Sequence, residues 1–141
     1  MSARRRPTGG DEGSILPLVI GYAMLALVAI LVCTAATSLY LEQKRLDGLA
    51  DAAALAGADG FVLTVVAGVP RAELTDRKVR DQAEALVAAA APDVAVTSAS
   101  SPDGRSARVT VAGFWRPPLL TPFVPDGVPL QATGTSRTAL R

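Results

Sequence analysis

The residue types that usually perform chemistry are sparse in this chain of 141 residues. The sequence has no histidine, a single cysteine at Cys33, and 13 Asp and Glu residues. Asp93, Asp103 and Asp126 each adjoin a proline or a glycine, in turn sequences where a carboxylate usually accepts hydrogen bonds from nearby backbone. No base, metal-ligand set or phosphate-cradling glycine loop accompanies them. We therefore expect that the protein is not an enzyme and uses no cofactor, and no small-molecule substrate is evident.

Composition narrows the class of protein further. The net charge is +1, and the run Arg4-Arg5-Arg6 is the one cluster of basic residues, so no basic face is available to bind nucleic acid. Half of the residues are hydrophobic but only 4% are aromatic, which predicts a modest core built from Ala, Val and Leu. A lone cysteine also excludes a disulfide framework.

The N-terminal region predicts a single membrane span. No charged residue occurs from Gly13 to Leu41, and the sequence from Ile15 to Val32 is almost continuously apolar. A helix needs about 20 such residues to cross a bilayer core of about 30 Å. We predict a transmembrane helix over residues 14–41, preceded by a basic tail over residues 1–13. By the positive-inside tendency, the arginines of the tail place the N-terminus in the cytoplasm and the rest of the chain outside the cell membrane.

Two other uses of this segment stay open. Thr34-Ala35-Ala36 could serve as a cleavage site for a secretory signal, although the apolar run is longer than the roughly 7–15 residues typical of such signals. Cys33 could carry a lipid, although the bulky Val32 before it fits that kind of site poorly. A retained anchor is the favoured interpretation, with Cys33 as a small apolar residue of the helix.

The predicted helix continues beyond the membrane over residues 42–60. Leucines and small residues recur there every three or four positions, which places them on one side of a helix. Small side chains at this spacing would let another helix approach closely, although an alanine-rich stretch also favours a helix whatever contacts it. The candidate packing face comprises Leu46, Leu49, Ala50, Ala53, Ala54 and Gly57.

Residues 61–141 predict a small extracytoplasmic α+β domain. The apolar run over residues 61–66 could extend the helix or form a strand, and a turn follows at Gly68-Val69-Pro70. We expect a second helix that Thr75 caps and that runs to about Ala91, where Pro92 ends it.

The last part of the domain predicts a small antiparallel sheet. Two β-type runs, over residues 94–97 and 107–111, flank the turn sequence Pro102-Asp103-Gly104 and indicate a hairpin. A third strand over residues 128–137 alternates apolar and polar side chains. The expected architecture is a long helix, a second helix and this sheet.

A proline-rich loop connects the second and third of these strands. It contains the candidate contact residues Phe114, Trp115, Leu119, Leu120 and Phe123. An exposed apolar loop of this kind would mark a contact with a partner protein or with the membrane interface. Alternatively, it folds back as a lid over the apolar face of the sheet, because a small sheet needs a covering layer.

The N-terminal third resembles a known family. An Asp-Glu-Gly-Ser sequence directly before the span, followed by Leu-Glu-Gln-Lys-Arg-Leu-Asp-Gly-Leu-Ala-Asp-Ala-Ala-Ala-Leu-Ala-Gly-Ala over residues 41–58, is similar to the TadE/TadG-like proteins of tight-adherence (Flp-type) pilus assembly. The C-terminal pattern of a Val-x-Val strand, a proline-flanked Leu-Leu loop and a strand that ends in Ser-Arg resembles the short actinobacterial members. The resemblance implies a pilin-like component of a Tad/Flp-type pilus or secretion assembly. Its partners would be the membrane and other pilin-like or Tad-type membrane proteins.

The same resemblance raises the question of processing. Prepilin-type processing cuts after a glycine and requires a glutamate five residues later. Counted from Gly13, that position is Leu18, and counted back from Glu12, the residue before the cut would be Pro7. Neither register fits, which again favours a retained anchor. A membrane-anchored binding or sensing module of the cell envelope, with Phe114, Trp115 and Phe123 lining the contact, is the alternative function.

Overall fold

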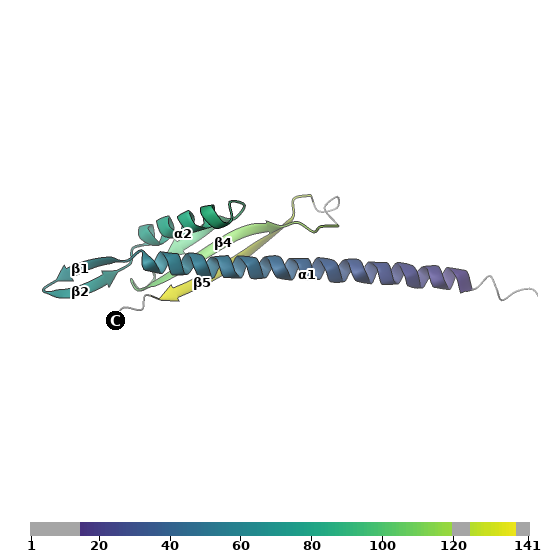
Figure 1. Cartoon of the computed structure of the whole chain (residues 1–141), viewed down its shortest axis with the longest axis horizontal. Coiled ribbons are helices and arrows are strands. Elements are labelled where there is room, and N and C mark those ends of the chain that lie inside the picture. The colour runs from purple at the N-terminus through teal and green to yellow at the C-terminus, as the bar shows by residue number, and fades with distance from the viewer. Residues whose placement is uncertain (1–14, 120–124, 138–141) are drawn as a thin grey trace, which may run out of the picture.

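The computed structural model describes residues 15–119 and 125–137, and its fold is α+β with a pilin-like arrangement (Figure 1). One long helix runs the length of the molecule, and a second helix and a three-stranded sheet pack against its C-terminal half. The elements in chain order are α1 (Ile15–Asp59), β1 (Val62–Val66), β2 (Val69–Glu73), α2 (Asp76–Ala90), β3 (Ala95–Ser100), β4 (Ser106–Trp115) and β5 (Val128–Arg137). The basic tail expected over residues 1–13 lies outside the described residues.

Helix α1 is continuous over 45 residues, about 67 Å at 1.5 Å per residue. Pro17 falls in its first turn, where the missing N–H removes no intrahelical hydrogen bond. The helix ends at Asp59, and the next residue, Gly60, donates its N–H to the carbonyl of Gly57 at 3.2 Å. The prediction that one helix carries both the apolar run and the alanine-rich tract is confirmed.

Strands β1 and β2 form a separate antiparallel hairpin, which settles the alternative left open for the run after α1 in favour of a strand. Its turn lies at Ala67-Gly68, and both residues have positive φ, 53° and 79°. Two-residue hairpin turns with this backbone match the right-handed twist of the strands. The turn predicted at residues 68–70 was therefore placed too late, because Val69 and Pro70 already pair with β1.

Helix α2 has the predicted extent and stops before Pro92. Thr75 occupies the N-cap position, but its side chain makes no capping hydrogen bond, so that part of the prediction was wrong. The carboxylate of Asp76 instead accepts a hydrogen bond from the N–H of Ser101, at 2.7 Å, across to the end of β3. Val79, Ala83 and Val87 form the buried face of the helix.

The main sheet has the order β3-β4-β5, antiparallel throughout. The β3–β4 hairpin turns through Pro102-Asp103-Gly104, as predicted, and Gly104 has a φ of 68°. A register shift occurs between Val96 and Ser98, and the hydroxyl of the intervening Thr97 donates to the Thr110 carbonyl at 3.2 Å. This bulge adds to the twist of the sheet.

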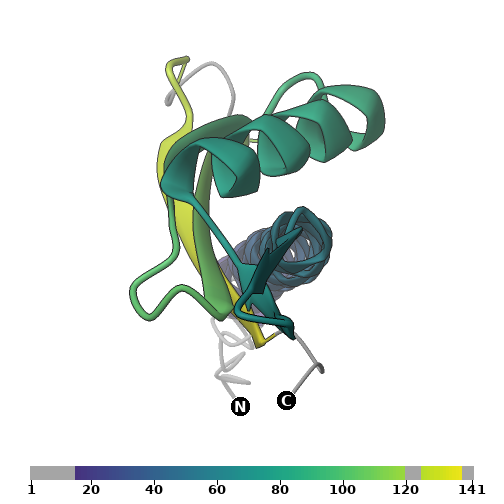
Figure 2. The ribbon, with the colours of Figure 1, turned by 90° about the vertical axis from the view of Figure 1, so that its left-hand side faces the viewer.

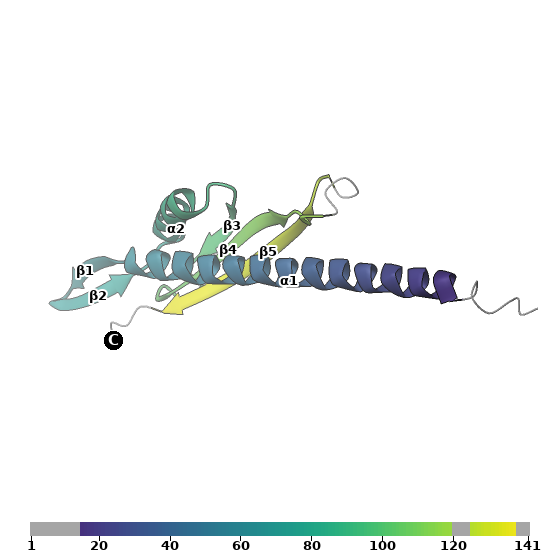
Figure 3. The same cartoon turned by 45° about the vertical axis from the view of Figure 1, so that its right-hand side comes forward.

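Both helices cover the same face of this sheet (Figures 2 and 3). Helix α1 contacts β4 and β5, whereas α2 contacts mainly β3. Strand β4 turns Ala107, Val109 and Val111 inward, all with no exposed surface, and leaves Arg108 exposed on the other side. The two helices thus cover the apolar face of the sheet, and Pro117 of the proline-rich loop is fully buried as well.

Candidate membrane and assembly surfaces

The N-terminal part of α1, Ile15–Val32, is called the apolar segment here. Its large apolar side chains are exposed, from 53% at Ile20 to 66% at Tyr22, except Leu31, which is half-buried. The first hydrogen bond between α1 and the sheet in the described chain joins Trp115 Nε1 to Ser38 Oγ at 3.1 Å. About 34 Å of helix precedes that bond, which compares with about 30 Å for a bilayer core. By length and composition, α1 is a helix that could cross a membrane once.

The candidate packing face lies inside the domain. Leu46, Ala50, Ala53 and Ala54 have no exposed surface, Gly57 is buried and Leu49 is half-buried. A Cβ added at Gly57 would lie 2.9 Å from the Cγ1 of Val79 on α2, so the missing side chain permits a close helix crossing. The helix that packs closely against this face is therefore the chain's own α2, and the sheet packs against the same face.

The approach of α1 to β5 is closer still. A Cβ added at Gly134 would lie 2.6 Å from the backbone nitrogen of Asp51 and nearer yet to the carbonyl group of Ala50. The backbones of helix and strand are therefore in direct contact, which only a glycine at this position of β5 permits. Sequence reasoning had not selected Gly134, although a glycine inside a strand signals a close backbone approach.

The same stretch of α1 also carries ion pairs beside the packing face. Lys44 pairs with Asp47 at 3.1 Å, and Arg45 pairs with Glu42 at 3.1 Å and with Asp93 at 3.4 Å. A hydrogen bond from Gln43, together with Lys44, lowers the pKa of Asp47, and the hydrogen bond to Asp47 raises the pKa of Lys44. Hydrogen bonding to Asp93 likewise raises the pKa of Arg45. These exposed pairs orient side chains but contribute little to stability.

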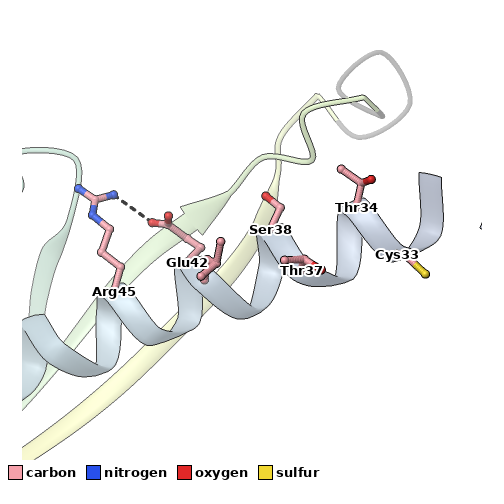
Figure 4. A pocket seen from close by; sticks show the side chains of 7 residues that line it. Cys33, Thr34, Thr37, Ser38, Glu42 and Arg45 are labelled. Atoms are coloured by element: carbon pink, nitrogen blue, oxygen red, sulfur yellow. Dashed lines mark hydrogen bonds and ion pairs between the residues drawn. The ribbon is translucent and has the colours of Figure 1, made fainter. Parts of the chain in front are cut away.

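A groove of about 660 Å³ opens where α1 leaves the domain (Figure 4). It is lined by Cys33, Thr34, Thr37, Ser38, Leu41, Glu42 and Arg45. Several of its polar side chains have partners within the chain: Thr34 donates to the Ile30 carbonyl at 2.8 Å, and Glu42 pairs with Arg45. Cys33 is a free, exposed thiol, and its side chain points away from those of Thr34 and Ser38 (Figure 4).

The candidate contact loop divides into two kinds of residue. Trp115 is half-buried and bonded to Ser38, whereas Phe114 is 63% exposed and Leu119 is 56% exposed. Phe114 and Trp115 are still part of β4, so the alternation of the strand turns the indole toward α1 and the phenyl ring away from it. Leu120 and Phe123 lie outside the described residues.

Of the two residues in the prepilin-type register considered above, only one belongs to the described residues. Gly13 lies outside them, and Leu18 is an exposed residue of the apolar segment.

The β1–β2 hairpin forms the end of the molecule opposite the apolar segment (Figure 1). It contacts no other helix or strand of the described chain. Val62, Leu63 and Val65 are 49%, 60% and 69% exposed, which makes the tip apolar. The sequence offered the signal, a β-branched run before a glycine, but periodicity alone could not distinguish it from more helix.

The three carboxylates considered first lie apart and have separate roles. Asp103 accepts hydrogen bonds from the N–H of Arg105 and from the N–H and hydroxyl of Ser106, and the bonds from Ser106 lower its pKa to about 2. Asp93 pairs with Arg45, and Asp126 precedes the turn glycine Gly127. Among residues 15–119 and 125–137, no three His, Cys, Asp or Glu side chains gather as a metal site would require.

Comparisons of the chain with protein-family models, with curated proteins and with solved structures gave no match.

Proposed function

We propose that the protein is a non-enzymatic, membrane-anchored, pilin-like component of a Tad/Flp-type pilus or secretion assembly. The observation that carries the proposal is the division of α1 into two halves. The first half is apolar and largely exposed, and the second half is the central element of a small domain. Such exposure is unfavourable in water, so the apolar segment requires lipid or other helices around it.

The proposed topology places the apolar segment in the cell membrane and the domain outside the cell. The arginines at positions 4–6 precede the segment closely and favour a cytoplasmic N-terminus. The anchor is retained, because neither register around Gly13 and Leu18 suits a prepilin peptidase.

The proposed assembly uses two surfaces, one at each end of the molecule. The apolar segment packs against the apolar helices of neighbouring subunits, and the tip hairpin docks on a neighbouring subunit's extracytoplasmic domain. The tip suits that role because an isolated two-stranded hairpin is only marginally stable and gains from further burial. The alanine-rich face does not contribute, since the chain's own sheet and α2 already occupy it.

Site-specific photo-crosslinking in the producing cells tests the proposal. A photoreactive residue replaces Leu25 in the apolar segment, Leu63 at the tip or, as a control, Thr135 on the exposed face of the sheet. We expect Leu25 and Leu63 to give protein adducts, identified by mass spectrometry as pilin-like or Tad-type membrane proteins. We expect few or no adducts from Thr135. If Leu25 and Leu63 give only uncrosslinked monomer, as Thr135 does, the assembly role is wrong.

A further inference from the structure

We infer that the end of the domain nearest the apolar segment is a second membrane contact, seated on the headgroup region of the bilayer that α1 crosses. The inference rests on the proposed anchoring of α1 and adds a partner for a surface that this anchoring leaves unexplained. The contact surface comprises Phe114, Arg116 and Leu119, at and after the end of β4. We call it the interfacial surface, and its partner is phospholipid.

The position of this surface along α1 is fixed by one hydrogen bond. Trp115 Nε1 bonds to Ser38 Oγ, and Ser38 lies about 9 Å beyond Val32, the end of the apolar segment, along the helix axis. The headgroup region adds about 5–8 Å to each side of the hydrocarbon core. The apolar segment is about 27 Å long, so a core of about 30 Å centred on it ends about 1–2 Å beyond Val32, and Ser38 lies about 7–8 Å outside the core. An α1 that spans the bilayer therefore brings the end of β4 to the outer part of the headgroup region. The cartoon shows the same relation, because β4 and β5 both reach toward the apolar half of α1 at this end (Figure 3).

The chemistry of the interfacial surface matches that level of a membrane. Phe114 and Leu119 expose most of their apolar surface although a two-helix layer already covers the inner face of the sheet. Trp115, whose indole carries an N–H, and Arg116 lie between these two residues in the sequence, and Arg116 is exposed. Aromatic residues with an apolar body and a polar edge, flanked by Lys and Arg, are typical of the membrane–water interface.

Charge on the loop favours phospholipid over a basic protein surface as the partner. From Gly104 to Pro125 the sequence contains no Asp or Glu, whereas Arg116 is exposed beside the two apolar side chains. A guanidinium at this depth can bind lipid phosphate while the neighbouring rings enter the acyl boundary. Two points of attachment, α1 and the loop, would then fix the tilt of the domain relative to the membrane.

The tip of the molecule provides a matched control. Leu63 at the β1–β2 hairpin is exposed to nearly the same extent as Leu119, 60% against 56%, but lies at the far end of α1. If the interfacial surface contacts lipid, a charge introduced at Leu119 weakens the membrane contact, whereas the same charge at Leu63 leaves that contact unchanged.

Trp115 is the only tryptophan in the sequence, so the full chain carries its own reporter. The protein is reconstituted in vesicles of phosphatidylcholine and phosphatidylglycerol, with lipids brominated near the headgroup or near the acyl-chain ends. We expect the shallow lipids to quench Trp115 more strongly than the deep ones. We also expect Leu119→Asp or Phe114→Asp to reduce the shallow quenching by about half and Leu63→Asp to leave it unchanged. Circular dichroism confirms that each variant is folded.

Two results would overturn the inference. One is equal quenching of Trp115 in wild type and in the Leu119→Asp and Phe114→Asp variants, which would assign the quenching to α1 alone. The other is no quenching by either lipid. A second reporter, Gly21→Trp in a Trp115→Phe background, separates this failure from failure of the anchor. If the deep lipids quench the tryptophan of the Gly21→Trp variant while Trp115 of the wild type is not quenched, the anchor stands and the interfacial surface is wrong; if neither is quenched, both are wrong.

Discussion

The close contact between α1 and β5 predicts that one added methyl group, in Gly134→Ala, destabilises the domain. Gly134→Ala places a Cβ against the backbone of Ala50 and 2.6 Å from the backbone nitrogen of Asp51, where ordinary contacts are about 3.4–4 Å. The nearest atoms all belong to the main chain of the helix, so no side chain can rotate away. Relief requires β5 and α1 to separate by about 1 Å along a buried interface.

The size of the effect follows from this geometry. Overpacking of a well-filled core costs about 1–3 kcal/mol, and a rigid backbone neighbour places Gly134→Ala at the upper end. Replacing glycine in a strand returns about 0.5–1 kcal/mol of backbone entropy. The expected net loss in the free energy of unfolding is about 2–2.5 kcal/mol, or roughly a thirtyfold to sixtyfold fall in the folded-to-unfolded ratio.

Gly48→Ala is the matched control for this substitution. Gly48 lies on the exposed side of the same helix, and a Cβ there would meet no atom within 4 Å. An alanine in an open helix interior should raise the free energy of unfolding by about 0.5–1 kcal/mol. The same chemical change is thus expected to have opposite signs at the two positions.

The assay is urea unfolding of the full chain in detergent micelles, followed by Trp115 fluorescence. We expect the midpoint to fall for Gly134→Ala and to rise slightly for Gly48→Ala, with unchanged slopes. If Gly134→Ala is as stable as wild type, or if both variants move in the same direction, the reasoning about the α1–β5 contact is refuted.

Three further predictions concern the domain. Leu46→Ala removes a fully buried leucine beside Gly113 and should lower the free energy of unfolding by about 3 kcal/mol in the same urea assay. Asp103 has a pKa of about 2 in the folded chain against an ordinary 3.8, so its contribution to stability is complete above the ordinary value and is lost as pH falls toward 2. Asp103→Asn should therefore flatten the stability–pH curve between these values, and an unchanged slope in an acid titration would contradict this. Arg45→Gln breaks exposed ion pairs and should change the free energy of unfolding by less than about 1 kcal/mol; a larger loss would show that the Asp93 pair matters more than its exposure indicates.

The sequence predicted the elements whose patterns admit one interpretation. The long charge-free run and the alanine-rich tract both favour a helix, so the bounds of α1 could be predicted almost to its last residue. The Pro-Asp-Gly turn between two β-type runs likewise indicated β3 and β4. Local chemistry decides each of these features, which is why one sequence sufficed.

Contacts between distant elements were harder to predict. Spacing placed Ala50 and Gly57 on a buried face but could not say whether another protein or the chain's own sheet and α2 covers it. The apolar run of β1 fits a strand and a helix equally well, and only the pairing with β2 distinguishes them. The proline-rich loop combines a half-buried Trp115 with an exposed Phe114, so the expected lid and the expected contact surface each describe one side of it. The resemblance to TadE/TadG-like proteins stays a prediction.

In the proposed topology, α1 lies in the membrane over its first half and in an extracytoplasmic domain over its second. Thiol labelling of intact cells with a membrane-impermeant maleimide tests this most directly, using single cysteines at Ala3, Gly21 and Thr135 in a Cys33→Ser background. We predict that Thr135→Cys is labelled in intact cells, that Ala3→Cys is labelled only after lysis, and that Gly21→Cys is protected until detergent is added. Labelling of Gly21→Cys in intact cells, or release of the chain into the medium, would contradict the account.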